Sequence, residues 1–276
     1  MIRDSVLSAI KAHALPPMPK QRRPIVIIGA GGIVRSAHLP AYEKGKFSVI
    51  GLMDQSLERA DLLAKSHAIA RTFDNIDSVV QFAPNDVVYD IAVPASQLSH
   101  ILPHIPDGSA VLMQKPMGET IEEARIIRDL CRTKNLTASV NFSLRYSPNN
   151  LAISALARAG LLGDLHDLQV QTTTYTPWDL WTFLATAPRV EIMYHSIHYF
   201  DLIRSWLGNP NSVYAKTVKT LTRLPWPRPR PSQSWTTAAT CGSSLQVIIT
   251  TTLARSISTA SCSGKVLVVR LASAWA

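Results

Sequence analysis

The stretch that decides the fold of this chain is Ile25-Val26-Ile27-Ile28-Gly29-Ala30-Gly31-Gly32-Ile33-Val34. An apolar run that ends at a glycine is typical of a short strand buried on both faces. The glycines that follow predict a tight turn into a helix, where backbone amides come close to a phosphate group. Val34 replaces the last glycine of a G-x-G-x-x-G pattern, which affects helix–strand packing more than phosphate contact. The stretch predicts a dinucleotide-binding domain with Gly29–Ile33 as its phosphate loop.

Strands and helices alternate on the carboxyl side of this loop. Strands are expected at residues 47–53, 87–93, 110–114 and 137–141, and helices at 37–44, 57–67, 97–105 and 119–135. This order predicts βαβ units with right-handed crossovers in a doubly wound parallel sheet, which is an α/β Rossmann domain. We assign residues 24–146 to this domain and residues 1–23 to an N-terminal helix and a Pro-rich linker.

The pattern changes after about residue 147. Helices are expected at residues 151–159 and 192–207, and strands at 166–176 and 212–221. Because strands and helices no longer alternate in βαβ order, residues 147–276 are predicted to form an α+β domain with a mostly antiparallel sheet.

An acidic residue, Asp54, ends the second expected strand, 25 residues after Gly29. A carboxylate roughly 20 residues beyond such a loop accepts hydrogen bonds from the adenosine ribose hydroxyls and repels a 2′-phosphate. Asp54 therefore favours NAD over NADP. Arg59 lies close enough in sequence to weaken that preference, so the predicted cofactor is NAD or NADP.

Four stretches resemble the glucose–fructose oxidoreductase/inositol dehydrogenase (Gfo/Idh/MocA) family. They are IVIIGAGGIVRSAHLPAY at 25–42, Gln114-Lys115-Pro116-Met117, NFSLRYSPNN at 141–150 with AGLLGDLHDLQV at 159–170, and HSIHYFDLIRSWLG at 195–208. Gln114 stands in place of the Glu of the family's Glu-Lys-Pro signature. The resemblance implies a Rossmann domain followed by an α+β domain. It also implies an enzyme that oxidises or reduces a hydroxyl or carbonyl on sugars, inositols and related polyols.

The resemblance further implies that Lys115 is the catalytic lysine and that His198 is the family's histidine. A Lys at the carboxyl edge of a parallel sheet can stabilise alkoxide charge, and a His exchanges protons near neutral pH. Tyr194 replaces the family's Asp four residues before His198, so His195 or Glu191 is an alternative member of a proton relay. Glu191, His195 and His198 recur at helical spacing, which leaves a metal site open. With no second ligand cluster in the sequence, we predict no metal.

Further residues are expected around the cofactor and the substrate. His100, which follows Val93-Pro94, resembles the family's histidine at the start of the next helix and is predicted to be structural or to lie near the cofactor, without a catalytic role. Trp178 is predicted either to line an aromatic wall against which a sugar ring packs or to lie in the core. The additional cofactor contacts are Pro94, His100, Lys115 and Asn141, and the substrate contacts are Arg145, Tyr194 and Trp178.

Composition excludes several other classes of protein. With 46% hydrophobic and 17% charged residues among 276, the chain can bury a sizeable core. Its three cysteines have no CxxC spacing, which argues against a disulfide framework or a zinc site. No apolar run is as long as a membrane span, and residues 1–15 lack a signal-peptide core. We therefore predict a cytoplasmic protein without a membrane partner.

The basic charge is confined to one part of the chain. Residues 202–276 contain nine Lys or Arg and no Asp or Glu, so the whole net charge of +9 falls there. The charges are scattered among Ser, Thr, Ala and Val, which argues against a nucleic-acid partner. We expect instead that residues 253–276 are translated out of the family's reading frame. One allowed set of codons for residues 262–276, read two bases later, encodes Gln-Trp-Glu-Gly-Thr-Arg-Gly-Ala, which resembles the family's Glu-Gly-Thr-x-Gly-Ala segment.

A shifted frame would leave the second domain truncated and its sheet incomplete. An unpaired sheet edge would then be exposed, and formation of the homo-oligomer that the resemblance implies would be disfavoured. Gln114, Tyr194 and the unusual tail also favour an alternative function. In that alternative, the chain is a catalytically weak or inactive nucleotide-binding homologue with a binding or regulatory role. The leading prediction remains an NAD(P)-dependent oxidoreductase acting on a small polyol or sugar.

Overall fold

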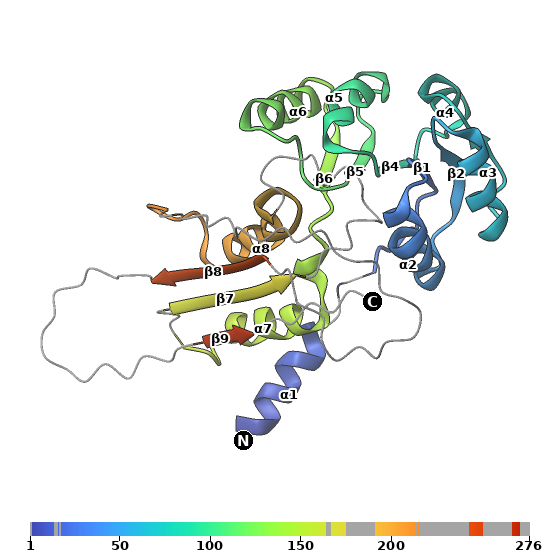
Figure 1. The fold of residues 1–276 in the computed structure, drawn as a ribbon. Coiled ribbons are helices and arrows are strands. Elements are labelled where there is room, and N and C mark those ends of the chain that lie inside the picture. Colours follow the sequence, from blue (N-terminus) through green and yellow to red (C-terminus); the bar gives the residue numbers. More distant parts are fainter. Residues whose placement is uncertain are drawn as a thin grey trace, which may run out of the picture.

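The computed structural model of the chain describes residues 2–13, 16, 18–163, 167–174, 191–213, 215, 243–250 and 267–270. Figure 1 shows a six-stranded sheet with helices around it and a separate three-stranded sheet beside α7 and α8. The candidate site residues of the first sheet lie at or just beyond the carboxyl ends of its strands.

The six-stranded sheet is parallel throughout, with the order β3-β2-β1-β4-β5-β6. This is the strand order of a Rossmann fold, so the α/β prediction for this part of the chain is confirmed. The strands are β1 (Ile25–Ile28), β2 (Val49–Met53), β3 (Thr72–Phe73), β4 (Val88–Ile91), β5 (Ala110–Met113) and β6 (Thr137–Val140).

Helical segments connect these strands, and polar caps mark where three of them begin. The side chains of Ser56, Asn75 and Thr120 accept hydrogen bonds from amides in the first turn of α3, α4 and α6. The segments are the π-helical η1 (Val34–His38), α2 (Leu39–Gly45), α3 (Leu57–Ser66), α4 (Ile76–Phe82), the 3₁₀ turn η2 (Ala95–Gln97), α5 (Leu98–Ile101), the 3₁₀ turn η3 (Leu102–His104) and α6 (Ile121–Thr133).

Two of these elements, β3 and α4, have no counterpart in the sequence prediction. Strand β3 is only two residues long and pairs with the end of β2, so its periodicity is too short to detect. Helix α4 is a seven-residue helix of mixed composition, although its Asn75 cap is a recognisable start signal.

Strand β1 supplies the centre of the core because its side chains alternate between the two faces of the sheet. Val26 and Ile28 pack on the side covered by α4, α5 and α6. Ile25 and Ile27 pack on the other side, with residues of α2 and α3. All four are nearly or fully inaccessible to solvent, which explains why the run is apolar without interruption.

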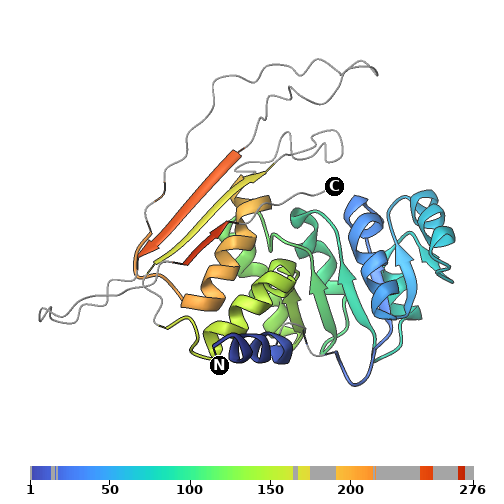
Figure 2. The same ribbon diagram turned by 90° about the horizontal axis from the view of Figure 1, so that it is seen from below.

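The second part of the chain contains a three-stranded sheet with the order β8-β7-β9. Leu168 and Val170 of β7 pack against Tyr199 and Ile203 of α8, so α8 lies between the two sheets, as Figure 2 shows. The elements are the 3₁₀ turn η4 (Ser143–Tyr146), α7 (Pro148–Arg158), β7 (Asp167–Thr174), the π-helical η6 (Glu191–Ser196), α8 (Ile197–Leu207), β8 (Ser243–Thr250) and β9 (Leu267–Arg270).

The expected mostly antiparallel sheet is seen only in part. Strand β8 pairs antiparallel with β7, whereas β9 pairs parallel with the other edge of β7. Ser212 and Val213 lie outside any strand, and most of the strand expected at 212–221 lies outside the described residues. The described part of the tail is β9. The out-of-frame tail at 253–276 and the domain boundary after residue 146 remain predictions.

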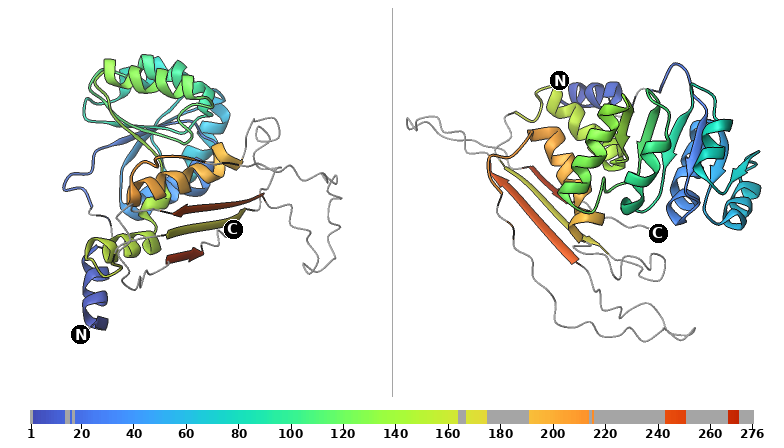
Figure 3. Two further views of the ribbon diagram at one scale, coloured as in Figure 1. Left: turned by 90° about the vertical axis from the view of Figure 1, so that its left-hand side faces the viewer. Right: turned by 90° about the horizontal axis from the view of Figure 1, so that it is seen from above.

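Helix α1 (Ile2–His13) packs against α7, far in sequence but adjacent in space (Figures 2 and 3). Helix α1 therefore attaches to the second part of the chain. Within the described residues, none of the helices is both long and apolar enough to cross a membrane.

Candidate active site

The glycine loop has two distinct steric requirements. Gly29 has a φ of +108°, and a Cβ there would lie 2.4 Å from the Ala92 carbonyl oxygen. Only glycine fits this close approach of two strands. At Gly31, in contrast, an added Cβ would meet nothing within 4 Å. The loop backbone therefore borders open space at the amino end of η1, as a bound phosphate requires.

Asp54 connects this loop to the end of β2. Its side chain is largely buried, with Oδ2 accepting the Ala30 amide at 2.8 Å and Oδ1 accepting the Ser56 amide at 2.9 Å. Nη1 of Arg59 lies 3.5 Å from Oδ1, on a side chain that is 60% exposed. Asp54 is thus a fixed acceptor beside the loop, with an exposed cation within reach. The glycine turn, the open space at Gly31 and this carboxylate fit a dinucleotide.

Lys115 lies immediately beyond the end of β5, in the loop that leads to α6. Its Nζ donates to the carbonyl oxygen of Tyr194 at 2.5 Å, which joins the parallel sheet to η6. Burial lowers the pKa of the Lys115 ammonium to about 8. About a tenth of Lys115 is therefore uncharged at pH 7 and about half at pH 8, so it can accept as well as donate a proton.

His198 lies on α8, close enough to Lys115 for the charge of one to affect the other. Burial, together with the charges of Lys115 and His195, lowers the pKa of His198 to about 4, although the charge of Asp201 opposes the shift. The ring packs edge-on against Phe142, with centroids 5.9 Å apart. His198 is accordingly a neutral imidazole at neutral pH. Lys115 and His195 lie close enough to His198 for their charges to affect it, and the catalytic roles of all three remain predictions.

The assumption of one regular helix through Glu191, His195 and His198 is wrong. Residues Glu191–Ser196 form a π-helical turn, which holds more residues per turn than an α-helix. Residues four apart in this segment therefore do not lie one above the other. Within the described part of the chain, no three potential metal-ligating side chains form a group. The side chain of Glu191 is outside the described residues.

A buried polar cluster next to Lys115 was missed in the sequence prediction. His38 Nδ1 lies 2.7 Å from Asp90 Oδ2, and the Tyr42 hydroxyl donates to the same oxygen at 2.8 Å. On its other side, His38 Nε2 lies 3.2 Å from Gln114 Nε2 and 3.3 Å from Asn141 Nδ2. An Asp inside an apolar strand is the signal that could have revealed the cluster, because a buried carboxylate needs partners.

Two predicted cofactor contacts lie elsewhere on the surface of the sheet's carboxyl edge. Pro94 is exposed at the start of η2, and His100 is exposed on α5. The histidine that the structure brings to Asn141 is His38. Cofactor contact by Pro94 and His100 remains a prediction.

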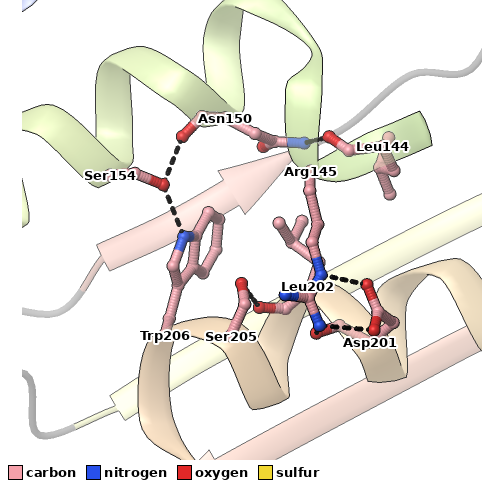
Figure 4. A network of polar contacts seen from close by, with 8 residues as sticks. All are labelled: Leu144, Arg145, Asn150, Ser154, Asp201, Leu202, Ser205 and Trp206. Atoms are coloured by element: carbon pink, nitrogen blue, oxygen red, sulfur yellow. Dashed lines mark hydrogen bonds and ion pairs between the residues drawn. The ribbon is translucent and has the colours of Figure 1, made fainter. Parts of the chain in front are cut away.

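Arg145, predicted to contact substrate, binds an acidic residue of α8. Its guanidinium forms a two-pronged ion pair with Asp201, with Nη2 to Oδ1 at 2.5 Å. Figure 4 shows this pair beside a second connection, in which Trp206 Nε1 donates to Ser154 Oγ at 2.8 Å. These contacts fix α8 against η4 and α7. Arg145 therefore holds the helix that carries His198.

The other two predicted substrate residues differ in how far the structure describes them. Tyr194 is buried, and its hydroxyl donates to Glu119 Oε1 at 2.5 Å. Burial and the Glu119 charge raise the pKa of the Tyr194 phenol. The phenol therefore stays protonated and is paired with protein. Trp178 lies outside the described residues.

The parallel strand order, the glycine turn and the acidic residue after β2 define a dinucleotide-binding fold. Residues 23–142 match the oxidoreductase family with an NAD-binding Rossmann fold, Gfo/Idh/MocA. Residues 23–142 are therefore similar to the NAD-binding domain of this family.

Known proteins of similar sequence and fold agree with this placement. Glucose-6-phosphate 3-dehydrogenase of Bacillus subtilis is 30% identical over 148 residues, which is 53% of this chain and 41% of that protein. An Agrobacterium radiobacter oxidoreductase in complex with NAD+, L-tartaric acid and magnesium aligns with a TM-score of 0.58 at 20% identity, over 68% of this chain and 55% of that one. Apo scyllo-inositol dehydrogenase of Lactobacillus casei aligns with a TM-score of 0.54 at 20% identity, over 69% of this chain and 56% of that one. The chain thus spans roughly half the length of these relatives.

Proposed function

We propose that this chain is an NAD(P)-dependent oxidoreductase that transfers a hydride between a nicotinamide and a hydroxyl or carbonyl of a sugar, inositol or related polyol. The observation that carries the proposal is that Lys115, just beyond the carboxyl end of β5, lies close enough to His198 for its charge to affect that ring. Ligands of such sheets bind at that edge. The match of residues 23–142 to the family, and the sugar and inositol dehydrogenases among the similar proteins, support this substrate class.

The nicotinamide, when bound, supplies the hydride acceptor or donor, and the protein supplies the proton chemistry. Lys115 has a pKa of about 8, close to the working pH at which a general acid–base group is most effective. In the oxidation direction, neutral Lys115 accepts the hydroxyl proton. In the reduction direction, its ammonium returns that proton to the carbonyl oxygen.

His198 has a different role because its ring stays neutral throughout the working range of pH. A neutral imidazole can hydrogen-bond the reacting oxygen without adding charge that would lower the pKa of Lys115 further. The Arg145–Asp201 ion pair holds α8, and with it His198, in place. His195 lies near enough to affect His198 and completes the proposed group.

For the cofactor, we propose NAD as the preferred dinucleotide. Asp54 presents a negatively charged edge beside the glycine loop, which repels a 2′-phosphate. Arg59 partly neutralises that edge, because its guanidinium reaches Asp54 at 3.5 Å. The preference is therefore expected to be moderate.

The test combines nucleotide binding with a polyol screen. Binding of NAD and NADP to the full chain is measured first, and NADH absorbance is then followed with inositols, hexoses and hexose phosphates. Turnover with a member of this panel, lost in Lys115→Met while NAD binding is kept, is the expected result. Binding without turnover on any polyol would favour the inactive, nucleotide-binding alternative.

A further inference from the structure

Asp90 is the most deeply buried carboxylate of the parallel sheet and has no part in the proton chemistry proposed above. It lies on the central strand β4 and is wholly inaccessible to solvent. Both of its described donors, His38 Nδ1 and the Tyr42 hydroxyl, meet the same oxygen, Oδ2. A buried carboxylate is costly unless it is hydrogen-bonded, so these two contacts fix the orientation of Asp90.

The direction of the hydrogen bond between Gln114 and His38 follows from one backbone amide. The Lys115 N–H can only donate, and it lies 2.9 Å from Gln114 Oε1. The amide nitrogen of Gln114 must then face His38 Nε2, at 3.2 Å. Because that nitrogen is itself a donor, Nε2 must be the unprotonated acceptor. The ring proton of His38 therefore resides on Nδ1 and points at Asp90.

We propose that Asp90, His38 and Gln114 are positioning residues for Lys115, linked by a neutral His38 that carries its proton on Nδ1. The chain of hydrogen bonds runs from the core carboxylate to the backbone amide of Lys115. It fixes the point from which the Lys115 side chain extends toward Tyr194 and His198. The positioning role, but not the protonation pattern, rests on the proposed function.

The identity of residue 114 determines this arrangement. A carboxylate at position 114 has no proton to donate to Nε2. His38 would then have to become an imidazolium that donates to Asp90 on one side and to residue 114 on the other. Gln114 instead allows a neutral ring. A Glu at position 114 of this chain would therefore imply a different protonation state of His38.

The first experiment reads the protonation of His38 directly from the ¹⁵N signals of its ring in the full chain at neutral pH. In the wild type, we expect a neutral ring protonated at Nδ1. In Gln114→Glu, we expect both nitrogens to be protonated. Gln81→Glu, an exposed change of the same kind on α4, should leave the ring as in the wild type. A wild-type ring protonated at Nε2, or no change in Gln114→Glu, would overturn the proposal.

The second experiment tests positioning without needing a substrate. His38→Phe keeps the ring volume but interrupts the series of hydrogen bonds from Asp90 to the Lys115 amide. Because His38 does not itself contact that amide, any effect there must pass through Gln114. Exchange of the Lys115 amide proton should become about fivefold faster or more, while amides of β2 stay protected. Gln114→Ala gives the same readout if His38→Phe does not fold. Unchanged exchange in a folded variant would refute the relay.

The third readout is the split between kcat and KM on the polyol found in the screen. Gln114→Ala should lower kcat by about 10- to 100-fold with KM and NAD affinity within a few-fold of wild type, because a displacement of about 1 Å can cost 10² in rate. A wild-type kcat in Gln114→Ala would refute positioning. If the wild-type chain turns over no polyol, the proposed function fails, and the ring protonation and amide exchange still decide the arrangement.

Discussion

Replacement of Lys115 by Met should change how the stability of the protein depends on pH. The pKa of Lys115 is lowered from 10.5 to about 8 because the folded protein disfavours its buried charge. The unfolded chain has no such restraint, so it binds more protons than the folded chain between these two pH values. Stability therefore rises with pH across this window and is lower below it.

The magnitude follows from the shift itself. A change of 10.5 to about 8 corresponds to about 3 kcal/mol, which we reduce to about 2 kcal/mol because the side chain is only partly buried. Lys115→Met has no group that titrates, so it lacks this gain. Between about pH 7 and about pH 10.5, the wild type should gain about 2 kcal/mol relative to the variant.

Urea unfolding at both pH values measures this difference. Comparing the change between pH values cancels the lost hydrogen bond to Tyr194 and any repacking around Met, since neither depends on the titration of Lys115. Lys65→Met, an exposed change on α3, is the matched control and should show no such gain. If the free energies of unfolding of the wild type and Lys115→Met differ by the same amount at both pH values, Lys115 does not carry a buried charge and the reasoning is refuted.

Three further predictions concern the loop, the cofactor and His198. Asp54→Ala should weaken the binding of NAD about tenfold and the binding of NADP less. Equal losses of affinity in titrations with the two cofactors would contradict the ribose contact. Gly29→Ala should cost about 3 kcal/mol or more in urea unfolding, because its Cβ overlaps the Ala92 carbonyl, whereas Gly31→Ala should change stability by less than about 0.5 kcal/mol yet weaken NAD. Wild-type stability should fall by up to about 3 kcal/mol from its His198 contribution as pH drops from 6.5 to about 4, since only the unfolded chain takes up that proton. His198→Phe should lack this loss, and an identical acid profile would argue against a buried neutral ring.

Much of the parallel domain could be predicted because its signals are local. The apolar run of β1 and the glycines after it lie within ten residues, and Asp54 follows at the end of the next strand. Such patterns depend on backbone geometry and burial, which neighbouring residues largely determine. The structure confirms the β1–loop–β2 arrangement and adds that Asp54 binds the loop amide of Ala30.

The partners of the site residues could not be predicted, because they come from distant parts of the sequence. His38 meets Asp90, Gln114 and Asn141 only after three different strands have paired. The π-helical turn before α8 likewise has no simple sequence pattern, and it places the Tyr194 carbonyl at Lys115. Sequence reasoning thus identified the candidate reacting groups more readily than the contacts that hold them.

The pH dependence of kcat/KM for polyol oxidation tests the central claim, that Lys115 handles the substrate proton, most directly. Because kcat/KM reports groups of the uncomplexed enzyme, the wild-type value should rise about tenfold per pH unit and level off above about pH 8. Lys115→Met should lose about 10²- to 10⁴-fold in rate and lose this inflection. A wild-type profile that is flat between about pH 6 and about pH 9, or an inflection that persists in Lys115→Met, would contradict the account.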